Sequence, residues 1–183
     1  MGILDLILGK GTDGSLRMGE VDIVSPETET VRKIVGELDD LEPQRARYIA
    51  CFAYLLSRVA HADLDISEEE TEAMERIVLE RGLLPEAHAI IVVQMAKSRA
   101  VIFGATEDYL VAREFNDVAS QEQKLALVDC LFAVSASHEG ISSIEDAEIG
   151  KIANELKLSR EDVASLRGAY QGHLNVLKSP ENH

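Results

Sequence analysis

The sequence predicts an all-α protein, a duplicated helical bundle of about seven to eight helices. Apolar residues make up 46% of its 183 residues, but aromatic residues make up only 4% and tryptophan is absent. Such a core packs through Leu, Ile, Val and Ala, which favours helix against helix. Apolar residues also recur at helical spacing along most of the chain. An acidic turn between two such segments, residues 60–70, returns as residues 135–145.

Residues 1–26 are predicted to lie outside the bundle. Residues 3–8 form a short apolar segment, and the glycines at positions 9, 11, 14 and 19 indicate a flexible linker with a short extended piece at 20–24. The apolar segment is too short and too acidic for a signal peptide, and no apolar run reaches transmembrane length. We expect it to dock on the domain or on a partner, with weak membrane contact as the less favoured alternative.

The bundle is expected over residues 27–177, followed by a frayed tail at 178–183. Prolines and small polar residues open its first four helices, which are predicted at residues 26–38, 43–62, 67–81 and 85–104. Gly82 supplies the stop of the third helix. The predicted core faces of these helices are Val31, Ile34, Val35 and Leu38; Ile49, Phe52, Ala53, Leu56, Val59 and Ala60; Met74, Ile77 and Val78; and Ala89, Ile90, Val93, Ala96 and Ala100.

The second half is predicted to hold four more helices. One spans about residues 107–118, and Ser120, Ser142 and Ser159 open the following three. The core faces are expected to be Leu110, Val111, Phe115 and Val118; Leu125, Val128, Leu131, Phe132 and Ser135; and Ile149, Ile152, Ala153 and Leu156. The last helix is expected to be long, because helical spacing continues through Val163, Leu166, Tyr170, Leu174 and Leu177.

An internal repeat relates the two halves, at about residues 44–104 and 119–177. A shift of 75 residues needs no gap and preserves both the polar and the apolar positions around the turns. Identical pairs include Leu56 and Leu131, Ile66 and Ile141, Ser67 and Ser142, Glu70 and Glu145, and Ile77 and Ile152. Each repeat reads as helix, acidic turn, helix, short break and helix. Duplication of this kind predicts two pseudo-symmetric copies facing each other in one bundle.

The charge is strongly acidic, with 33 Asp and Glu against 18 Lys and Arg, a formal net charge of −15. This excludes nucleic acid as a natural partner, because phosphate binding needs clustered basic residues. Anionic membrane surfaces are disfavoured for the same reason. Cations and the basic faces of other proteins are the partners that the negative electrostatic field of the chain would attract. Cys51 and Cys130 both lie in apolar helical patterns, so buried reduced thiols and a reducing, cytoplasmic location are expected.

Part of each acidic turn is explained by helix capping. The Ser67-x-x-Glu70 and Ser142-x-x-Glu145 sequences have the pattern of capping boxes. In a capping box the serine accepts from the backbone N–H three residues on, and the glutamate reaches back to the N–H of the serine. These four residues therefore need no metal to account for them.

The other polar residues of the turns are not explained by capping, and they are called the surplus polar residues below. Asp63 and Asp65, with Glu70, offer several carboxylate oxygens, which suit a hard cation such as Ca²⁺, Mg²⁺ or Mn²⁺. The second turn carries His138 and Glu139 with Glu145. An imidazole shifts that site towards Zn²⁺ or another transition metal. An EF-hand is excluded, because a loop that starts at Asp63 has Glu68 where Gly is required and Met74 where Glu is required.

The stretch Ala62-Asp63-Leu64-Asp65-Ile66-Ser67-Glu68-Glu69-Glu70 resembles the TerB-like (tellurite resistance B) family. His138-Glu139-Gly140-Ile141-Ser142 is similar, although the usual Asp is replaced and the first turn lacks the usual Gly. The resemblance covers roughly residues 28–177 and implies an all-α, duplicated bundle tied to tellurite and chemical stress. It further implies a divalent-cation site at Asp63, Asp65 and Glu70, and another at Glu139 and Glu145.

Two functions remain open at this stage. The first is a cytoplasmic, stress-associated module that binds a divalent cation through its turns. The alternative is a protein-interaction scaffold with no functional metal. An enzyme is not expected, because no nucleophile elbow, phosphate-binding loop, HExxH or dinucleotide fingerprint is present. His88 and His173 read as ordinary helix-surface residues, and the oligomeric state is left undetermined.

Overall fold

The computed structural model describes residues 36–60, 67–98, 108–137 and 140–175. Within these ranges there are seven α-helices and one short 3-10 helix, residues 36–39 are also helical, and no strand occurs. The all-α prediction is confirmed. No helix in these ranges is long and apolar enough to cross a membrane. The predictions for residues 1–26, for most of the helix at 26–38 and for the tail at 178–183 lie outside the described residues.

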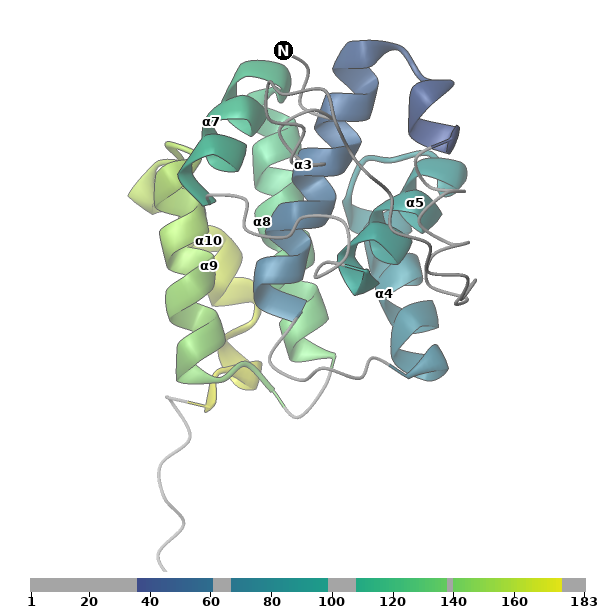
Figure 1. The fold of residues 1–183 in the computed structure, drawn as a ribbon. Coiled ribbons are helices and arrows are strands. Elements are labelled where there is room, and N and C mark those ends of the chain that lie inside the picture. Colours follow the sequence, from purple (N-terminus) through teal and green to yellow (C-terminus); the bar gives the residue numbers. More distant parts are fainter. Residues whose placement is uncertain (1–35, 61–66, 99–107, 138–139, 176–183) are drawn as a thin grey trace, which may run out of the picture.

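Two long helices, α3 (Pro43–Ala60) and α8 (Gln121–Ala136), occupy the middle of the bundle (Figure 1). The α4–α5 pair lies on one side of them, and α7, α9 and α10 lie on the other. The middle helix α3 packs against α5, α7, α8 and α9, so it joins both sides. The helices are α3 (Pro43–Ala60), α4 (Glu68–Arg81), α5 (Glu86–Lys97), α7 (Asp108–Val118), α8 (Gln121–Ala136), α9 (Ser143–Glu155) and α10 (Arg160–Ala169), followed by the 3-10 helix η1 (Gln171–His173).

Helix α3 is buried on all sides rather than along one stripe. Every residue from Tyr48 to Val59 is buried. The sequence predicted a single core face, and this was too narrow because the helix is surrounded by other helices. The buried run includes Ser57 and Arg58, two polar residues that must find partners inside the protein.

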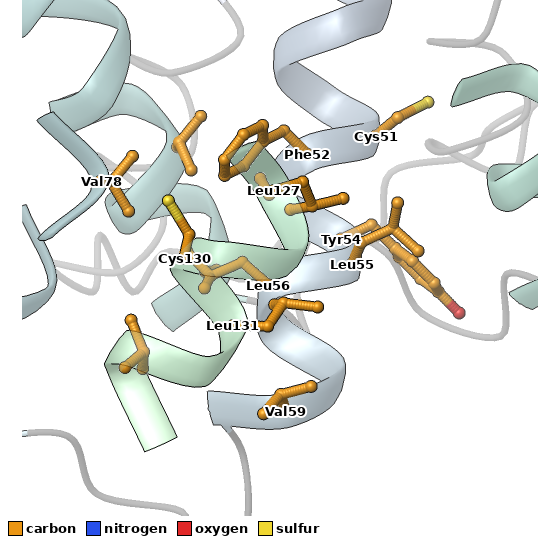
Figure 2. Close-up of a cluster of buried hydrophobic side chains, with 14 of the residues drawn as sticks. Cys51, Phe52, Tyr54, Leu55, Leu56, Val59, Val78, Leu127, Cys130 and Leu131 are labelled. Carbon is orange, nitrogen blue, oxygen red and sulfur yellow. The ribbon is translucent and has the colours of Figure 1, made fainter. Parts of the chain in front are cut away.

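The centre of the core lies between α3, α4 and α8. Figure 2 shows Phe52, Leu55 and Leu56 of α3 beside Leu127 and Leu131 of α8. Both cysteines are free and buried, as predicted. Burial, followed by the charge of Asp129, raises the pKa of the Cys130 thiol to about 12. The thiol is therefore protonated at neutral pH and acts as a packing group.

The last helix is shorter than the sequence predicted. Helix α10 ends at Ala169, and the chain then passes through the 3-10 helix into an extended Leu174. Leu174 is buried, with 1% of its surface exposed, as expected for a core residue. However, it is part of a backbone bridge to Ile141 and not of a helix. The prediction of a helix running to Leu177 was therefore wrong. The prediction followed the apolar spacing alone and took no account of Gly172, a poor helix former, which lies in the 3-10 helix after α10.

Gly82 ends α4, as predicted, with φ −79°, and the next residue, Leu83, lies in the left-handed region with φ 53°. One core assignment on α5 needs correction. Ile90 was assigned to the core face of α5, yet it is 42% exposed. The neighbouring Ile91 and Val92 are buried in its place. The α5 core face is therefore rotated relative to the predicted one.

The helix bounds follow the predicted repeat. Helix α4 begins at Glu68 and α9 at Ser143, which the shift of 75 residues relates directly. The ends of α3 and α8 and the starts of α5 and α10 agree with the same shift within one residue. The pseudo-twofold arrangement of the two copies in space stays a prediction.

Candidate functional site

Each acidic turn leads into a helix that begins with a complete capping box. The Ser67 side chain accepts from the Glu70 N–H at 3.2 Å, and the Ser67 N–H donates to Glu70 Oε2 at 2.7 Å. At α9 the corresponding distances, for Ser142 and Glu145, are 3.2 and 2.8 Å. Both predicted capping boxes are confirmed. Each turns a glutamate carboxylate back towards the chain that enters the helix.

The remaining predicted site residues, Asp63, Asp65, His138 and Glu139, lie outside the described residues. Of the predicted ligands, the structure therefore describes Glu70 and Glu145, one in each turn. Within the described ranges no group of three or more His, Cys, Asp or Glu side chains is placed to hold a metal ion. The two capped carboxylates belong to separate helices, Glu70 to α4 and Glu145 to α9.

The second turn is tied to the end of the domain. The Ile141 N–H donates to the His173 carbonyl oxygen at 2.7 Å, and the Asn175 N–H donates to the Ile141 carbonyl oxygen at 2.9 Å. Gly140 precedes this bridge with φ +100°. A Cβ at Gly140 would lie 2.8 Å from the His173 oxygen and 2.8 Å from Asn175 Oδ1. Both the backbone conformation and the close approach therefore require glycine.

A charge cluster around a buried arginine joins the helix that enters the first turn to the helix that leaves the second. We name it the Arg58 network; it consists of Arg58 of α3, Asp108 of α7, and Glu148 and Glu155 of α9. The Arg58 side chain is 2% exposed. Its Nε donates to Glu148 Oε1 at 2.8 Å and its Nη1 to Glu155 Oε2 at 2.6 Å. Nη2 contacts Glu148 Oε1 ionically at 2.6 Å without hydrogen-bond geometry.

Asp108 completes this network at the start of α7. Its Oδ2 lies 3.7 Å from Arg58 Nε, and its Oδ1 accepts from the Tyr54 hydroxyl at 2.6 Å. Burial lowers the pKa of Arg58, but the hydrogen bonds to Glu155 and Glu148 outweigh burial and raise it overall. Arg58 therefore stays charged and fixes α3, α7 and α9 relative to one another. Its only sequence signal is a lone arginine inside an apolar run.

The family model for tellurite resistance protein TerB matches residues 48–168. This chain belongs to the TerB family. The match covers more than half of the chain, from within α3 to within α10, and includes both acidic turns. The resemblance carried by residues 62–70 and 138–142 is confirmed, and the domain is one associated with tellurite resistance. No curated protein and no solved structure matched the chain.

Removing a cap from either turn of this TerB domain is expected to lower its stability. Ser67→Ala and Ser142→Ala each remove a side-chain acceptor from a helix N-terminus, which costs about 1 kcal/mol of unfolding free energy. Urea denaturation measures this loss. Ser143→Ala is the matched control, because Ser143 is exposed next to the α9 cap but does not cap the helix. Equal stabilities of the Ser142 and Ser143 variants would contradict the assigned caps.

His88 differs from the surface residue that the sequence suggested. Its Nδ1 accepts from Arg45 Nε at 3.1 Å, with Arg45 Nη2 at 3.0 Å. Burial and then the charge of Arg45 lower the pKa of His88 below its ordinary value. The arrangement therefore holds a neutral imidazole between α3 and α5.

A low pKa of His88 makes a small part of the stability of this TerB domain pH-dependent. The unfolded chain takes up a proton near pH 6.5, whereas folded His88 does so only at lower pH. The contribution is therefore complete above about pH 6.5 and is lost as the pH falls towards the folded pKa. NMR titration is expected to give a pKa below 6.5 that rises in Arg45→Gln. A pKa unchanged by Arg45→Gln would show that Arg45 does not set it.

Proposed function

We propose that this TerB domain binds a divalent cation through its acidic turns, in the cytoplasm, as part of a response to tellurite or related chemical stress and without catalysing a reaction. The capping boxes carry this proposal. In both copies they hold a glutamate carboxylate against the N-cap backbone, and the surplus polar residues come shortly before that N-cap in the sequence. A helix cap alone does not require Asp63 and Asp65, or His138 and Glu139, in the residues that precede it.

The ligand atoms of each turn suit a cation, provided that the capping glutamate and the polar residues before the cap both contribute. A Ca²⁺ ion takes about six to eight oxygen ligands, and Mg²⁺ takes fewer from protein because it keeps its waters. One capped carboxylate per turn is too few, so Asp63 and Asp65 would complete the first site. Glu70 lies at the start of α4, where its Oε2 accepts the Ser67 N–H, and it would be the ligand from the helix side of the first site.

The second site would draw on His138 and Glu139, with Glu145 in the role of Glu70. A buried hydroxyl close to this turn supports a further polar partner there. Ser135 lies on the last turn of α8 and is 2% exposed, and its Oγ has no hydrogen-bond partner within the described residues. Burying an unpaired hydroxyl costs about 1–3 kcal/mol. A hydrogen bond to a ligand of the second site would recover that cost.

Thermal unfolding with and without Ca²⁺, Mg²⁺, Mn²⁺ or Zn²⁺ tests the proposal, with calorimetry for the affinity. A cation at a hundredfold excess over its Kd stabilises the folded state by about 2.7 kcal/mol, which raises the Tm by several degrees. We expect the combined substitution Asp63→Asn and Asp65→Asn to abolish the rise at the first turn. The matched control is Glu68→Gln with Glu69→Gln, which removes the same charge from exposed positions in the first turn of α4.

Two outcomes would contradict cation binding. One is that none of the four ions raises the Tm at millimolar concentration. The other is that the control pair weakens binding as much as the Asp63 and Asp65 pair, which would indicate a general charge effect. Either result would favour the alternative function, a protein-interaction scaffold without a functional metal.

The two turns are expected to differ in ion preference. His138 stands where the first turn has Asp63, and an imidazole favours Zn²⁺ over Ca²⁺ and Mg²⁺. His138→Ala is therefore expected to remove a Zn²⁺-dependent rise in Tm while leaving a Ca²⁺- or Mg²⁺-dependent rise unchanged. A loss of all responses together in His138→Ala would contradict separate sites.

A further inference from the structure

A groove with an apolar floor and an acidic rim lies between α4 and α5. Its volume is about 230 Å³. Leu79 of α4 and Ile90 of α5 line it from opposite helices, and the buried Ala89 of α5 also lines it. Leu79 is 43% exposed and Ile90 is 42% exposed. Each helix therefore presents a large aliphatic side chain to solvent at the same groove.

Exposed aliphatic residues gather on this helix pair. Of the five large hydrophobic residues that are exposed in the described ranges, three lie on α4, α5 or their connection. They are Leu79, Leu83 and Ile90; the other two are Tyr109 and Ile144. Leu83 lies outside the groove, whereas Leu79 and Ile90 both line it. Single exposed hydrophobic residues need no explanation, but two that line one groove are typical of a binding surface.

The charges around the groove are mostly negative. Three glutamates line it, Glu72 and Glu75 from α4 and Glu86 from α5, against a single guanidinium, that of Arg76. Glu75 is held in place by Gln94, whose Nε2 donates to Glu75 Oε1 at 3.3 Å. An apolar floor between acidic walls selects a ligand that is apolar along one face and basic along its flanks.

We propose that the α4–α5 groove binds a basic amphipathic helix of a partner protein. A helix with aliphatic residues at i, i+3 or i+4, and i+7 would place them between Leu79 and Ile90, and its Lys and Arg residues would meet Glu72, Glu75 and Glu86. Two other occupants match less well. A second copy of the same groove would bring one acidic rim against another. The apolar N-terminal segment, residues 3–8, has no basic residue and contains Asp5.

A fluorescein-labelled peptide built from Leu and Lys, with Leu on one helical face, tests this proposal on the full chain. Fluorescence anisotropy is measured in EDTA, so that the result does not depend on cation binding at the turns. We expect Leu79→Ser with Ile90→Ser to weaken binding at least about tenfold. We expect Glu72→Gln with Glu86→Gln to weaken binding and to reduce its salt dependence.

Matched variants and peptides separate the groove from the general acidity of the chain. Ile144→Ser removes an aliphatic side chain that is 79% exposed on α9, and Glu161→Gln removes an exposed charge on α10. Both are expected to bind like the parent chain. Equal loss in the control and groove variants, or equal binding of a scrambled peptide of the same composition, would overturn the proposal. The proposal would also be overturned if the double variant Leu6→Ser with Leu8→Ser bound the peptide more tightly than the parent chain does. That result would show that the N-terminal segment occupies the groove.

Discussion

Replacing Arg58 by methionine is expected to lower the free energy of unfolding by about 3 kcal/mol, the low end of the range for breaking a buried ion pair. The substitution keeps most of the aliphatic volume inside α3 but removes the positive charge from between Glu148, Glu155 and Asp108. The three carboxylates then repel one another. The cost stays at the low end because Asp108 and Glu148 are 38% and 28% exposed and keep contact with water.

Urea denaturation of paired variants checks the role of Arg58. Lys151→Met is the control, because Lys151 Nζ lies 3.7 Å from Asp108 Oδ2 but its side chain is 55% exposed. An exposed pair of this kind contributes at most about 1 kcal/mol. Adding Glu148→Gln and Glu155→Gln to Arg58→Met should recover stability, because Asp108 is then the one carboxylate of the network that stays charged, and it is 38% exposed and lies 3.7 Å from Lys151 Nζ. If the triple variant is less stable than Arg58→Met, charge repulsion is not the cause of the loss.

Gly140→Ala is expected to destabilise the domain by about 2–3 kcal/mol. The φ of +100° strains any residue with a Cβ, a cost of about 1–3 kcal/mol. The new Cβ would also meet the His173 carbonyl oxygen at 2.8 Å, so the bridge between Ile141 and Leu174 would have to shift. Because Gly140 directly follows Glu139, the same shift would change the geometry of the second turn.

Gly150→Ala provides the matched control for this substitution. Gly150 lies inside α9, and an added Cβ there meets no atom within 4 Å. Alanine in a helix interior is favoured over glycine by about 0.5–1 kcal/mol, so this variant should be slightly more stable than the parent chain. Thermal and urea unfolding of both variants measure the difference. Similar stabilities of the two variants would show that neither the positive φ nor the close approach of the His173 carbonyl oxygen requires glycine at position 140.

The helices and their caps could be predicted because their signals are local. Serine before an apolar period marked the starts of α4, α8 and α9, with Glu three residues on at α4 and α9. All three starts are complete capping boxes in the structure, and at α8 the third residue on is Gln123. The full burial of α3 could not be predicted in the same way. A stripe of apolar residues reports one packed face, whereas the second face of α3 is buried because α7 and α9 lie on it.

The sequence predicted the position of a candidate site residue only where a capping pattern or the local charge was enough to identify it. Glu70 and Glu145 were placed correctly by the capping pattern. The Arg58 network was missed because its members are far apart in the sequence, Arg58 and Glu155 by nearly a hundred residues, and nothing local pairs them. The groove was missed for a related reason. Helical periodicity placed Ile90 in the core, and only the packing of α4 against α5 shows that it faces solvent.

The bridge between Ile141 and Leu174 also determines where the folding unit ends. The family match stops at residue 168 and α10 at Ala169, so sequence similarity would suggest cutting the chain there. A chain cut at that point loses Leu174, whose burial is worth about 1.5–3 kcal/mol, and leaves the backbone of Ile141 without its partners. At the other end the match begins at residue 48, after α3 has started at Pro43 and buried Ala46. The smallest piece of this chain that can be expected to fold is therefore longer at both ends than the part it shares with its family.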